Sequence, residues 1–445
     1  MTFIGGELPL ASFPPHDQTV SLSTSLDAKD VSRMNKASIR SWQLAAVCCV
    51  ALACGCTKTE PPAFQLNMLD LEQQEVPRDQ QQTIANVLEA MYGTPNDPYV
   101  LPETGLKIDR IEMAAGPVWS DEHGRQRGLY RQHCGHCHGT SGDGAGPTAM
   151  ILDPYPRDYR PGLFKFKSTE RGAKPTDEDL KRVVHDGVPG TAMPSFALLP
   201  EAEIDALVEY VKYLSLRGET ERGLVSAVLD LGEGEKLPIE RATLVDEVLQ
   251  PIVERWTTAN ESVIRPAEKP AIELAQSVDK GRELYYGARA NCVKCHGPSA
   301  LGDGQTTDYD DWSKPIAELA RTVAATPEQI AKDKEMSKDD KDKALARNEE
   351  LAEALEGVLP PRPIRPRNLR LGVYRGGRRP LDLYRRFHAG IAGAPMPGVG
   401  PSAPGGQATL SPEEIWQLVD YVMSLPYEPT SAPPRQPKFA GQTPR

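Results

Sequence analysis

Helices are the main elements that the sequence predicts, and three observations point to them. Two segments, 199–214 and 410–425, place apolar residues at positions i, i+3, i+4 and i+7, which is typical of an amphipathic helix with one buried face. The stretch 308–359 is rich in Ala, Glu, Lys and Asp, which favours charged, solvated helices. No βαβ pattern surrounds the cysteine pairs at 134–137 and 292–295. The chain is therefore expected to be mainly helical.

Composition narrows the kind of protein before any motif is considered. The length of 445 residues predicts two to three domains, and the net charge of −11 argues against nucleic acid as a partner. No run is long and apolar enough to span a bilayer as a mature helix. The eight cysteines fall into an N-terminal group and two C-x-x-C pairs, so none is left over as a lone nucleophile.

An export signal is predicted near the N-terminus. Lys36 and Arg40 form a positive region, which is followed by the short apolar run 44–53 and then by small residues. We assign 34–53 to a signal peptide, which places the mature protein outside the bacterial cytoplasm. Residues 1–33 are assigned to an upstream mis-start or a disordered extension.

The end of the signal predicts a membrane tether. The Ala-Leu-Ala sequence before Cys54 resembles a bacterial lipobox, and the resemblance implies lipidation of Cys54 on the periplasmic side of a membrane. Cys56 is a competing lipidation site. Cleavage by an ordinary signal peptidase at the same place would instead leave the protein without a lipid.

One module occurs twice in the chain. HDGVPGTAMP at 185–194 aligns without gaps with HAGIAGAPMP at 388–397, and the two amphipathic segments that follow them align as well. Further upstream, RGLYRQHCGHCHG from residue 127 matches GRELYYGARANCVKCHG from residue 281. Three blocks that recur in the same order indicate a duplicated domain.

The chemistry of each copy centres on C-x-x-C-H, the signature of covalent haem c attachment. Cysteines three apart on a helical turn reach both vinyl groups of one haem, and the adjacent histidine lies under the iron. Each copy also has a methionine at the same place in a Gly/Pro loop, and a thioether is a soft iron ligand. The predicted attachment residues and iron ligands are Cys134, Cys137, His138 and Met193 in the first copy and Cys292, Cys295, His296 and Met396 in the second.

Comparison of the copies identifies the ligating histidine in YRQHCGHCHG. The second copy keeps a histidine only after its second cysteine, so His138 is the predicted ligand, and His133 and His136 are predicted to lie at the haem edge. A shared zinc ion would explain neither the His-Gly that follows each cysteine pair nor the repeated Met-Pro loops. A thioredoxin-like dithiol lacks its βαβ context.

These motifs resemble those of class I cytochrome c over residues 120–217 and 279–426, and the chain is similar to a tandem di-haem cytochrome c. The resemblance implies an all-α fold for each domain, two covalent haem c groups and electron transfer through an exposed haem edge. In the family a proline carbonyl accepts the ring N–H of the proximal histidine, a role that Pro147 would have in the first copy. The aligned Arg157 and Arg367 are candidates to neutralise haem propionates, with exposed surface arginines as the alternative.

The domain organisation follows from these assignments. The parts are a signal peptide at 34–53, an N-terminal extension at 54–119, a first cytochrome c domain at 120–218, a partly helical connector at 219–278, a second cytochrome c domain at 279–426 with a helical insertion at 308–359, and a disordered tail at 427–445. Helices are also expected near 80–91 in the extension and near 244–256 in the connector.

The predicted function is electron transfer by a periplasmic, membrane-tethered protein with two His/Met-ligated haems. Its partners would be redox proteins such as a quinol-oxidising complex, a periplasmic dehydrogenase or a terminal oxidase. The arginine-rich run 362–386 could dock such a partner, or it could pair with acidic residues of the insertion and with propionates. The alternatives are a di-haem peroxidase-like enzyme and a haem subunit of a respiratory complex.

Overall fold

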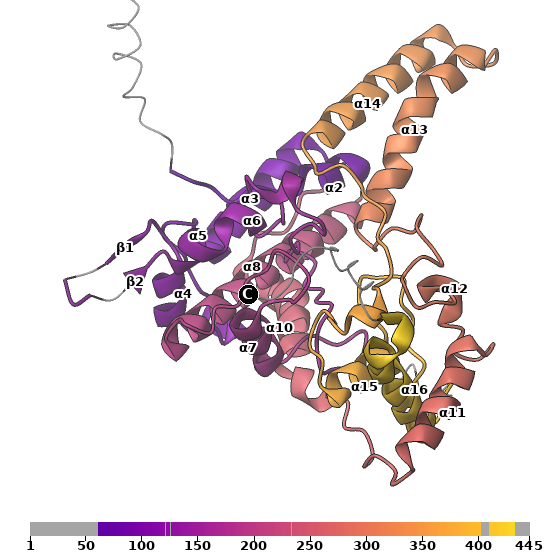
Figure 1. The fold of residues 1–445 in the computed structure, drawn as a ribbon. Coiled ribbons are helices and arrows are strands. Elements are labelled where there is room, and N and C mark those ends of the chain that lie inside the picture. The colour runs from indigo at the N-terminus through magenta and orange to yellow at the C-terminus, as the bar shows by residue number, and fades with distance from the viewer. Residues whose placement is uncertain (1–60, 121, 125, 233, 402–408, 432–445) are drawn as a thin grey trace, which may run out of the picture. The chain divides into compact units, whose positions relative to one another are not determined.

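The structure is a computed structural model that describes residues 61–120, 122–124, 126–232, 234–401 and 409–431. The predicted signal peptide, the lipidation site Cys54 and the part of the predicted disordered tail from residue 432 lie outside the described residues. Where the chain is described, it forms one unit of helices that are joined by ordered loops (Figure 1). The prediction of an all-α fold is confirmed.

The first half of the described chain contains one short hairpin among its helices. Its elements are α2 (Met68–Gln73), α3 (Arg78–Tyr92), η3 (Pro102–Thr104), α4 (Ile108–Ala114), β1 (Trp119–Ser120), β2 (Gln126–Arg127), α5 (Leu129–His133), α6 (Gly135–His138), η4 (Ala149–Ile151), α7 (Asp177–Asp186), α8 (Glu201–Leu229), α9 (Arg241–Thr243), the π-helical η5 (Leu244–Leu249), α10 (Gln250–Thr257) and η6 (Ala259–Ser262). β1 and β2 pair antiparallel.

The second half repeats the order of short motif helix, loop and closing helix around its own core. Its elements are α11 (Leu274–Tyr286), α12 (Val293–His296), α13 (Ser313–Lys332), α14 (Lys338–Glu356), η7 (Leu369–Leu371), α15 (Pro380–Ala389), α16 (Pro412–Ser424), η8 (Leu425–Tyr427) and η9 (Pro429–Ser431). Among the described residues, no helix combines the length and apolar character that a bilayer span requires.

The long helix α8 organises the first core. Its apolar face was predicted to end near residue 214, but the helix continues to Leu229 because Leu224, Val225 and Val228 extend the buried stripe. Gly218 does not break the helix, since its missing side chain makes room for the Arg160 backbone: a Cβ there would lie 2.4 Å from the Arg160 Cα. α3, α4, α7 and α10 pack against α8.

The first core therefore includes helices on both sides of the predicted domain. Ile84 and Leu88 of α3 and Ile252 and Val253 of α10 belong to the same buried cluster as α8. The helices predicted near 80–91 and 244–256 are confirmed, and both are integral to this core rather than peripheral to it. Burial of apolar surface, which contributes about 25 cal/mol of stabilising free energy per Å², is the main force that holds these helices in the core.

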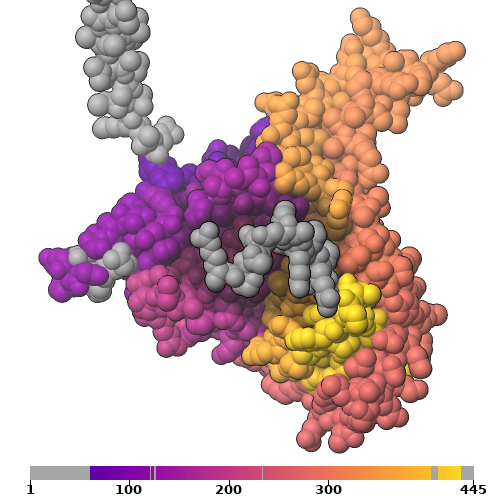
Figure 2. Space-filling model, viewed as in Figure 1, coloured from indigo at the N-terminus to yellow at the C-terminus, as the bar shows by residue number. Residues whose placement is uncertain are grey.

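A helical hairpin forms the predicted insertion. α13 and α14 pack against each other, and Figure 2 shows them standing out from the rest of the surface. α14 contains no fully buried residue, as its alternating charges require. The hairpin is attached through Arg347, whose guanidinium lies 3.1 Å from the Glu72 carboxylate of α2. The prediction of helices in 308–359 is confirmed.

The closing helix α16 begins with a capping box. The Ser411 hydroxyl accepts from the Glu414 N–H at 3.2 Å, and the Glu414 carboxylate accepts from the Ser411 N–H at 2.8 Å. Arg289 donates to both oxygens of the same carboxylate, at 2.5 and 2.9 Å. The amphipathic helix predicted over 410–425 is confirmed.

This cap predicts a pH dependence. The bond from Arg289 holds the pKa of Glu414 below its usual range. The carboxylate therefore adds stability that is present above the unfolded pKa of about 4.3 and is lost as the pH falls through the lower folded pKa. We expect Glu414→Gln to remove up to about 1 kcal/mol at pH 7 and less at acid pH, measured by denaturant unfolding at both pH values. The matched control Glu413→Gln should leave the pH dependence of stability unchanged. An equal loss of stability at both pH values in Glu414→Gln would contradict the role given to the Glu414 carboxylate.

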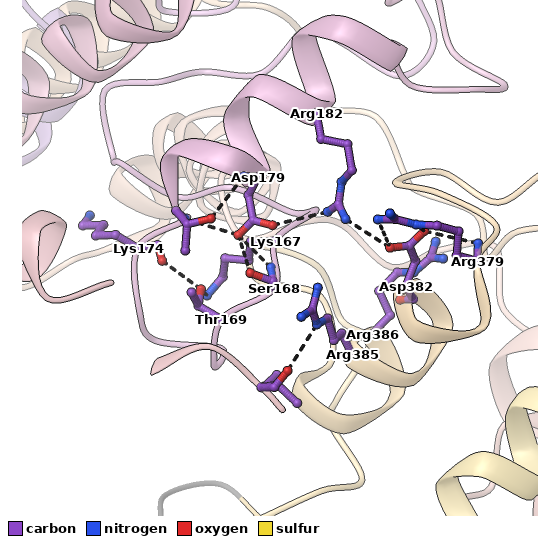
Figure 3. A network of polar contacts seen from close by, with 12 residues as sticks. Lys167, Ser168, Thr169, Lys174, Asp179, Arg182, Arg379, Asp382, Arg385 and Arg386 are labelled. Carbon is purple, nitrogen blue, oxygen red and sulfur yellow. Dashed lines mark hydrogen bonds and ion pairs between the residues drawn. The ribbon is translucent and has the colours of Figure 1, made fainter. Parts of the chain in front are cut away.

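Polar contacts join the two halves of the chain. Arg182 of α7 lies 3.3 Å from the Asp179 carboxylate on its own helix and 3.1 Å from the Asp382 carboxylate of α15 (Figure 3). Both carboxylates are nearly buried, and Asp179 also accepts from the backbone and hydroxyl of Ser168 at 2.8 and 2.9 Å. Removing one member of such a buried set leaves uncompensated charge, so the network fixes how α7 meets α15.

Most of the arginine-rich run is used inside the protein. Hydrogen bonds to carbonyls, carboxylates or a hydroxyl of the chain are made by Arg362, Arg367, Arg370, Arg378, Arg379, Arg385 and Arg386. The carboxylate partners are those of Glu428 and Asp382, which lie outside the insertion. The run therefore makes many contacts that stabilise this part of the protein, while Arg365, Arg378 and Arg379 remain exposed.

Candidate functional site

The two C-x-x-C-H motifs have the same local structure. In the first, α6 turns so that the His138 N–H donates to the Cys134 carbonyl at 2.9 Å. In the second, the His296 N–H donates to the Cys292 carbonyl, also at 2.9 Å. One helical turn thus fixes the positions of the cysteine and histidine side chains of each motif relative to one another.

A buried tyrosine side chain forms a hydrogen bond to the backbone directly after each C-x-x-C-H motif. The Tyr130 hydroxyl donates to the Gly139 carbonyl, and the Tyr285 hydroxyl donates to the Gly297 carbonyl, both at 2.8 Å. Both tyrosines are nearly fully buried. The two tyrosines occupy the same position in the repeat. Comparison of the two copies could therefore have identified them, whereas a single tyrosine gives no such indication.

The glycine after each histidine is required by close approach. Gly139 has a φ of 73°, and a Cβ there would lie 2.1 Å from a carboxylate oxygen of Asp143. Gly297 repeats this with a φ of 78° and 2.0 Å to Asp303. The GDG loops therefore fold back against the motifs, which explains the His-Gly pair in both copies.

The histidines of the two C-x-x-C-H motifs are oriented by backbone carbonyls. His138 Nδ1 lies 3.0 Å from the carbonyl oxygen of Arg157, and His296 Nδ1 lies 3.2 Å from that of Arg367. Because a carbonyl only accepts, Nδ1 carries the proton and Nε2 has a free lone pair. Burial lowers the pKa of His138 to about 4 and also lowers that of His296, so both rings are neutral near pH 7.

The role predicted for Pro147 is wrong, because the carbonyl of Arg157 performs it. The residues on either side of Pro147 donate to the far end of the motif, Gly146 to the Cys137 carbonyl at 3.0 Å and Thr148 to the His136 carbonyl at 3.0 Å. Pro147 is therefore exposed on the outside of the motif. The same role in the second copy, which the sequence left unassigned, belongs to the carbonyl of Arg367.

The two methionine loops also share one fold. The Val188 N–H donates to the Met193 carbonyl and the Thr191 N–H to the Val188 carbonyl, each at 3.1 Å. The Ile391 N–H donates to the Met396 carbonyl and the Ala394 N–H to the Ile391 carbonyl, again each at 3.1 Å. Equal backbone bonding at equal positions gives both methionine loops the same backbone turn.

A cavity brings the first set of predicted residues together. Its empty volume, which includes space open to solvent, is about 1660 Å³. Its walls include the predicted residues Cys134, Cys137, His138, Met193 and Arg157, together with the haem-edge candidates His133 and His136. Phe164, Leu180, Val184 and Phe196 supply apolar wall. A planar apolar group with a few polar attachments fits such a lining.

Arg157 is the predicted residue whose setting is most informative. The residue is half-buried, and one of its guanidinium nitrogens is fully buried without a hydrogen-bond partner in the protein. Burial lowers its pKa to about 10, against the opposing effect of nearby carboxylates such as that of Asp310. The donor and the charge fit the propionate of a haem in this cavity. Arg367 differs: its Nε donates to the Val373 carbonyl at 3.1 Å, and its guanidinium lies against Gly190 of the first methionine loop.

The thiols are those of isolated cysteines. The four described cysteines form no disulfide, and burial raises the pKa of Cys134 to about 12 and that of Cys292 to about 11. The thiols of Cys134 and Cys292 are therefore protonated near neutral pH. Over the described part of the chain, no cluster of three or more His, Cys, Asp or Glu side chains is arranged to hold a metal ion. Neither rival prediction, a shared zinc ion or a redox dithiol, gains support.

The second methionine loop is held from the first half of the chain. Arg171 donates to the Met396 carbonyl at 2.8 Å and to the Ala394 carbonyl at 3.1 Å. His388 of α15 lies 3.7 Å from the Glu170 carboxylate. Sequence reasoning missed Arg171, because nothing in its local sequence relates it to a loop more than two hundred residues away.

Comparison with known proteins agrees with these motifs. Residues 122–211 match the family described as "Cytochrome C oxidase, cbb3-type, subunit III". Cytochrome c55X of Paracoccus denitrificans (strain Pd 1222) is 36% identical over 111 residues, which are 24% of this chain and 84% of that protein. A chain of the reducing HAO-like protein complex of Kuenenia stuttgartiensis superposes with a TM-score of 0.40 and 24% identity, covering 69% of this chain and 98% of its own.

The match to cytochrome c55X spans most of that protein at an identity that indicates common descent. Together with the C-x-x-C-H motif inside the matched segment 122–211, it makes the chain a member of the cytochrome c family, a haem protein of electron transfer.

Proposed function

We propose that this cytochrome c is an electron carrier with two haems, one in each copy of the module. The observation that carries the proposal is the repeated geometry of the motifs. Each half has a histidine whose Nδ1 meets an arginine carbonyl, at 3.0 and 3.2 Å, and a methionine loop with the same backbone bonds. A site built twice in this detail is best explained by the same ligand bound twice.

The side chains divide the work of holding the cofactor. Cys134 with Cys137, and Cys292 with Cys295, would form the thioethers, while His138 and His296 would bind iron through Nε2. Met193 and Met396 would supply the second axial ligand. The haem, when bound, supplies an iron that takes up and releases one electron. The carbonyls of Arg157 and Arg367 keep the imidazoles in the tautomer and orientation that this requires.

The proposed haem sites also bear on the domain organisation of the chain and on its cellular location. We infer cytochrome c domains near 120–218 and 279–426, with the first core enlarged by α3, α4 and α10. An exported protein, tethered through Cys54 and exchanging electrons with redox proteins at the periplasmic face, agrees with covalent haem attachment outside the cytoplasm.

A haem subunit of a respiratory complex is the second candidate, and the match of 122–211 to an oxidase subunit family favours it. In that case electrons would pass within an assembly rather than by diffusion. A peroxidase-like enzyme is less well supported. Its reactive haem must release one axial ligand, whereas both methionine loops here are equally ordered by their own backbone bonds.

Replacing the methionines tests the proposal. Met193→His and Met396→His are each expected to lower the midpoint potential of one haem by more than about 0.1 V, because an imidazole stabilises ferric iron better than a thioether does. Each variant should also lose one of two sulfur-to-iron charge-transfer bands. Redox titration followed by visible spectroscopy measures both effects.

Met336→His, in the turn between α13 and α14, is the matched control and should change neither potential nor band. A native spectrum with a single haem, or with a high-spin or bis-histidine haem, would contradict the ligation and favour the enzyme. Two unaltered potentials in both methionine variants would show that neither methionine is a ligand.

A further inference from the structure

The cavity that holds Cys134, His138 and Met193 is not closed by the first half of the chain alone. A wall of this cavity comes from residues more than a hundred positions later in the sequence. That wall consists of Asp310, Trp312, Ser313, Arg362, Pro363, Ile364 and Arg375. The second half therefore completes the first candidate haem site.

Trp312 is the centre of this wall. Its indole ring lies 3.8 Å from the guanidinium carbon of Arg157 and 4.5 Å from the ammonium nitrogen of Lys165. On another side it meets Gly393 of the second methionine loop, where a Cβ would lie 2.5 Å from the ring. One side chain thus touches the first cavity and the loop that carries Met396.

The charged side chains in the wall of this cavity carry an excess of positive charge. The charged side chains in the cavity wall are the four cations Arg157, Lys165, Arg362 and Arg375 and the two carboxylates Asp153 and Asp310. Lys165 is paired with Asp310 at 3.3 Å. The Arg362 guanidinium is already used, since it donates to the Leu152 and Met150 carbonyls at 2.9 and 2.7 Å.

Two of these cations have donors that nothing in the protein accepts. One guanidinium nitrogen of Arg157 and Nε of Arg375 are buried without a hydrogen-bond partner. Burial lowers the pKa of Arg157 and of Arg375, and lowers that of Lys165 to about 8. Unpaired buried donors and charges are costly, so these groups are arranged for an anion that enters the cavity.

The nature of the anion follows from the charges and the lining. The excess of cations over carboxylates equals the charge of a dicarboxylate, and the rest of the cavity is largely apolar. We propose that Arg375, with Arg157 and Lys165, binds the two propionates of the first haem, and that Trp312 closes the site over them. The proposal rests on the proposed haem in this cavity, and adds that the second domain supplies part of its binding site.

The charge of Arg375 provides the test. Arg375→Gln removes the charge and leaves a shorter polar side chain, which should favour the ferric form of the first haem. We expect its reduction equilibrium to shift about tenfold, or about 59 mV for one electron, with a smaller change at the second haem. The first haem is assigned as the one whose potential Met193→His lowers.

Companion variants separate charge from packing. Arg375→Lys should keep the reduction equilibrium constant of the first haem within about threefold of native. Lys165→Gln should shift this equilibrium in the same direction as Arg375→Gln. Arg378→Gln, in the same loop but bonded to the Tyr427 hydroxyl at 2.7 Å, is the matched control and should have no effect. Thermal unfolding of each variant measures its loss of stability. A variant that only loses packing should unfold at a lower temperature but keep the native haem potential.

Native potentials in both Arg375→Gln and Lys165→Gln would overturn the proposal. An equal shift of both haem potentials in Arg375→Gln would also overturn it, because it would reflect the net charge of the whole protein rather than a contact with the first haem. Either result leaves the haem count and the methionine ligation of the native protein intact, so the carrier function would stand without this site.

Discussion

Replacing Cys134 and Cys137 together with alanine is expected to halve the covalently bound haem. A thioether needs a thiol sulfur, and no other described cysteine lies in the wall of the first cavity. Alanine is the suitable replacement, because Cys134 is only 8% exposed and a serine hydroxyl there would be buried among apolar groups. Haem per chain is measured by pyridine haemochrome absorbance, and the mass lost from the chain by mass spectrometry.

The second motif supplies the matched variant. Cys292→Ala with Cys295→Ala should lose the same amount of haem, and the variant lacking all four cysteines should lose all of it. A different outcome would be informative. If either pair alone abolished all binding, the cysteine pairs would share one ligand, and the arrangement of two independent haem sites would be wrong.

The repeat explains why so much of the site could be predicted. Two copies allow positions to be compared within one chain, so register alone predicts His138, rather than His133 or His136, as the ligand. Helix periodicity in 199–214 and 410–425 likewise predicted α8 and α16 with their buried faces. These features are local, and local sequence determines them through helix geometry and capping.

What could not be predicted depends on contacts between distant segments. Arg157 orients His138 through its backbone carbonyl, which any residue type provides, so no side chain marked the position. Arg171, Trp312 and Arg375 act across the boundary between the two halves, where sequence order carries no information about distance. The continuation of α8 to Leu229 was missed because Gly218 reads as a helix end until its contact with Arg160 is known.

Gly281 is expected to be the most sensitive glycine of the second core. It lies on α11 where that helix packs against α16 (Figure 1), and a Cβ there would lie 2.0 Å from the Gln417 carbonyl oxygen. Helix propensity alone predicts that Gly281→Ala gains about 1 kcal/mol. Overpacking against a backbone atom costs about 1 to 3 kcal/mol, so we expect a net loss of stability for alanine and a loss of about 3 kcal/mol or more for Gly281→Val.

The damage should reach the second haem site through Tyr285. This residue is on α11, and its hydroxyl holds the Gly297 carbonyl directly after the second C-x-x-C-H motif. Separation of α11 from α16 should therefore weaken the sulfur-to-iron band of the second haem and spare that of the first. Gly357→Ala is the matched control at the end of α14, since its Cβ would lie 3.5 Å from the nearest atom, and it should change stability by less than about 0.5 kcal/mol. A Gly281→Ala protein more stable than the native one in denaturant unfolding would mean that the helices do not cross this closely.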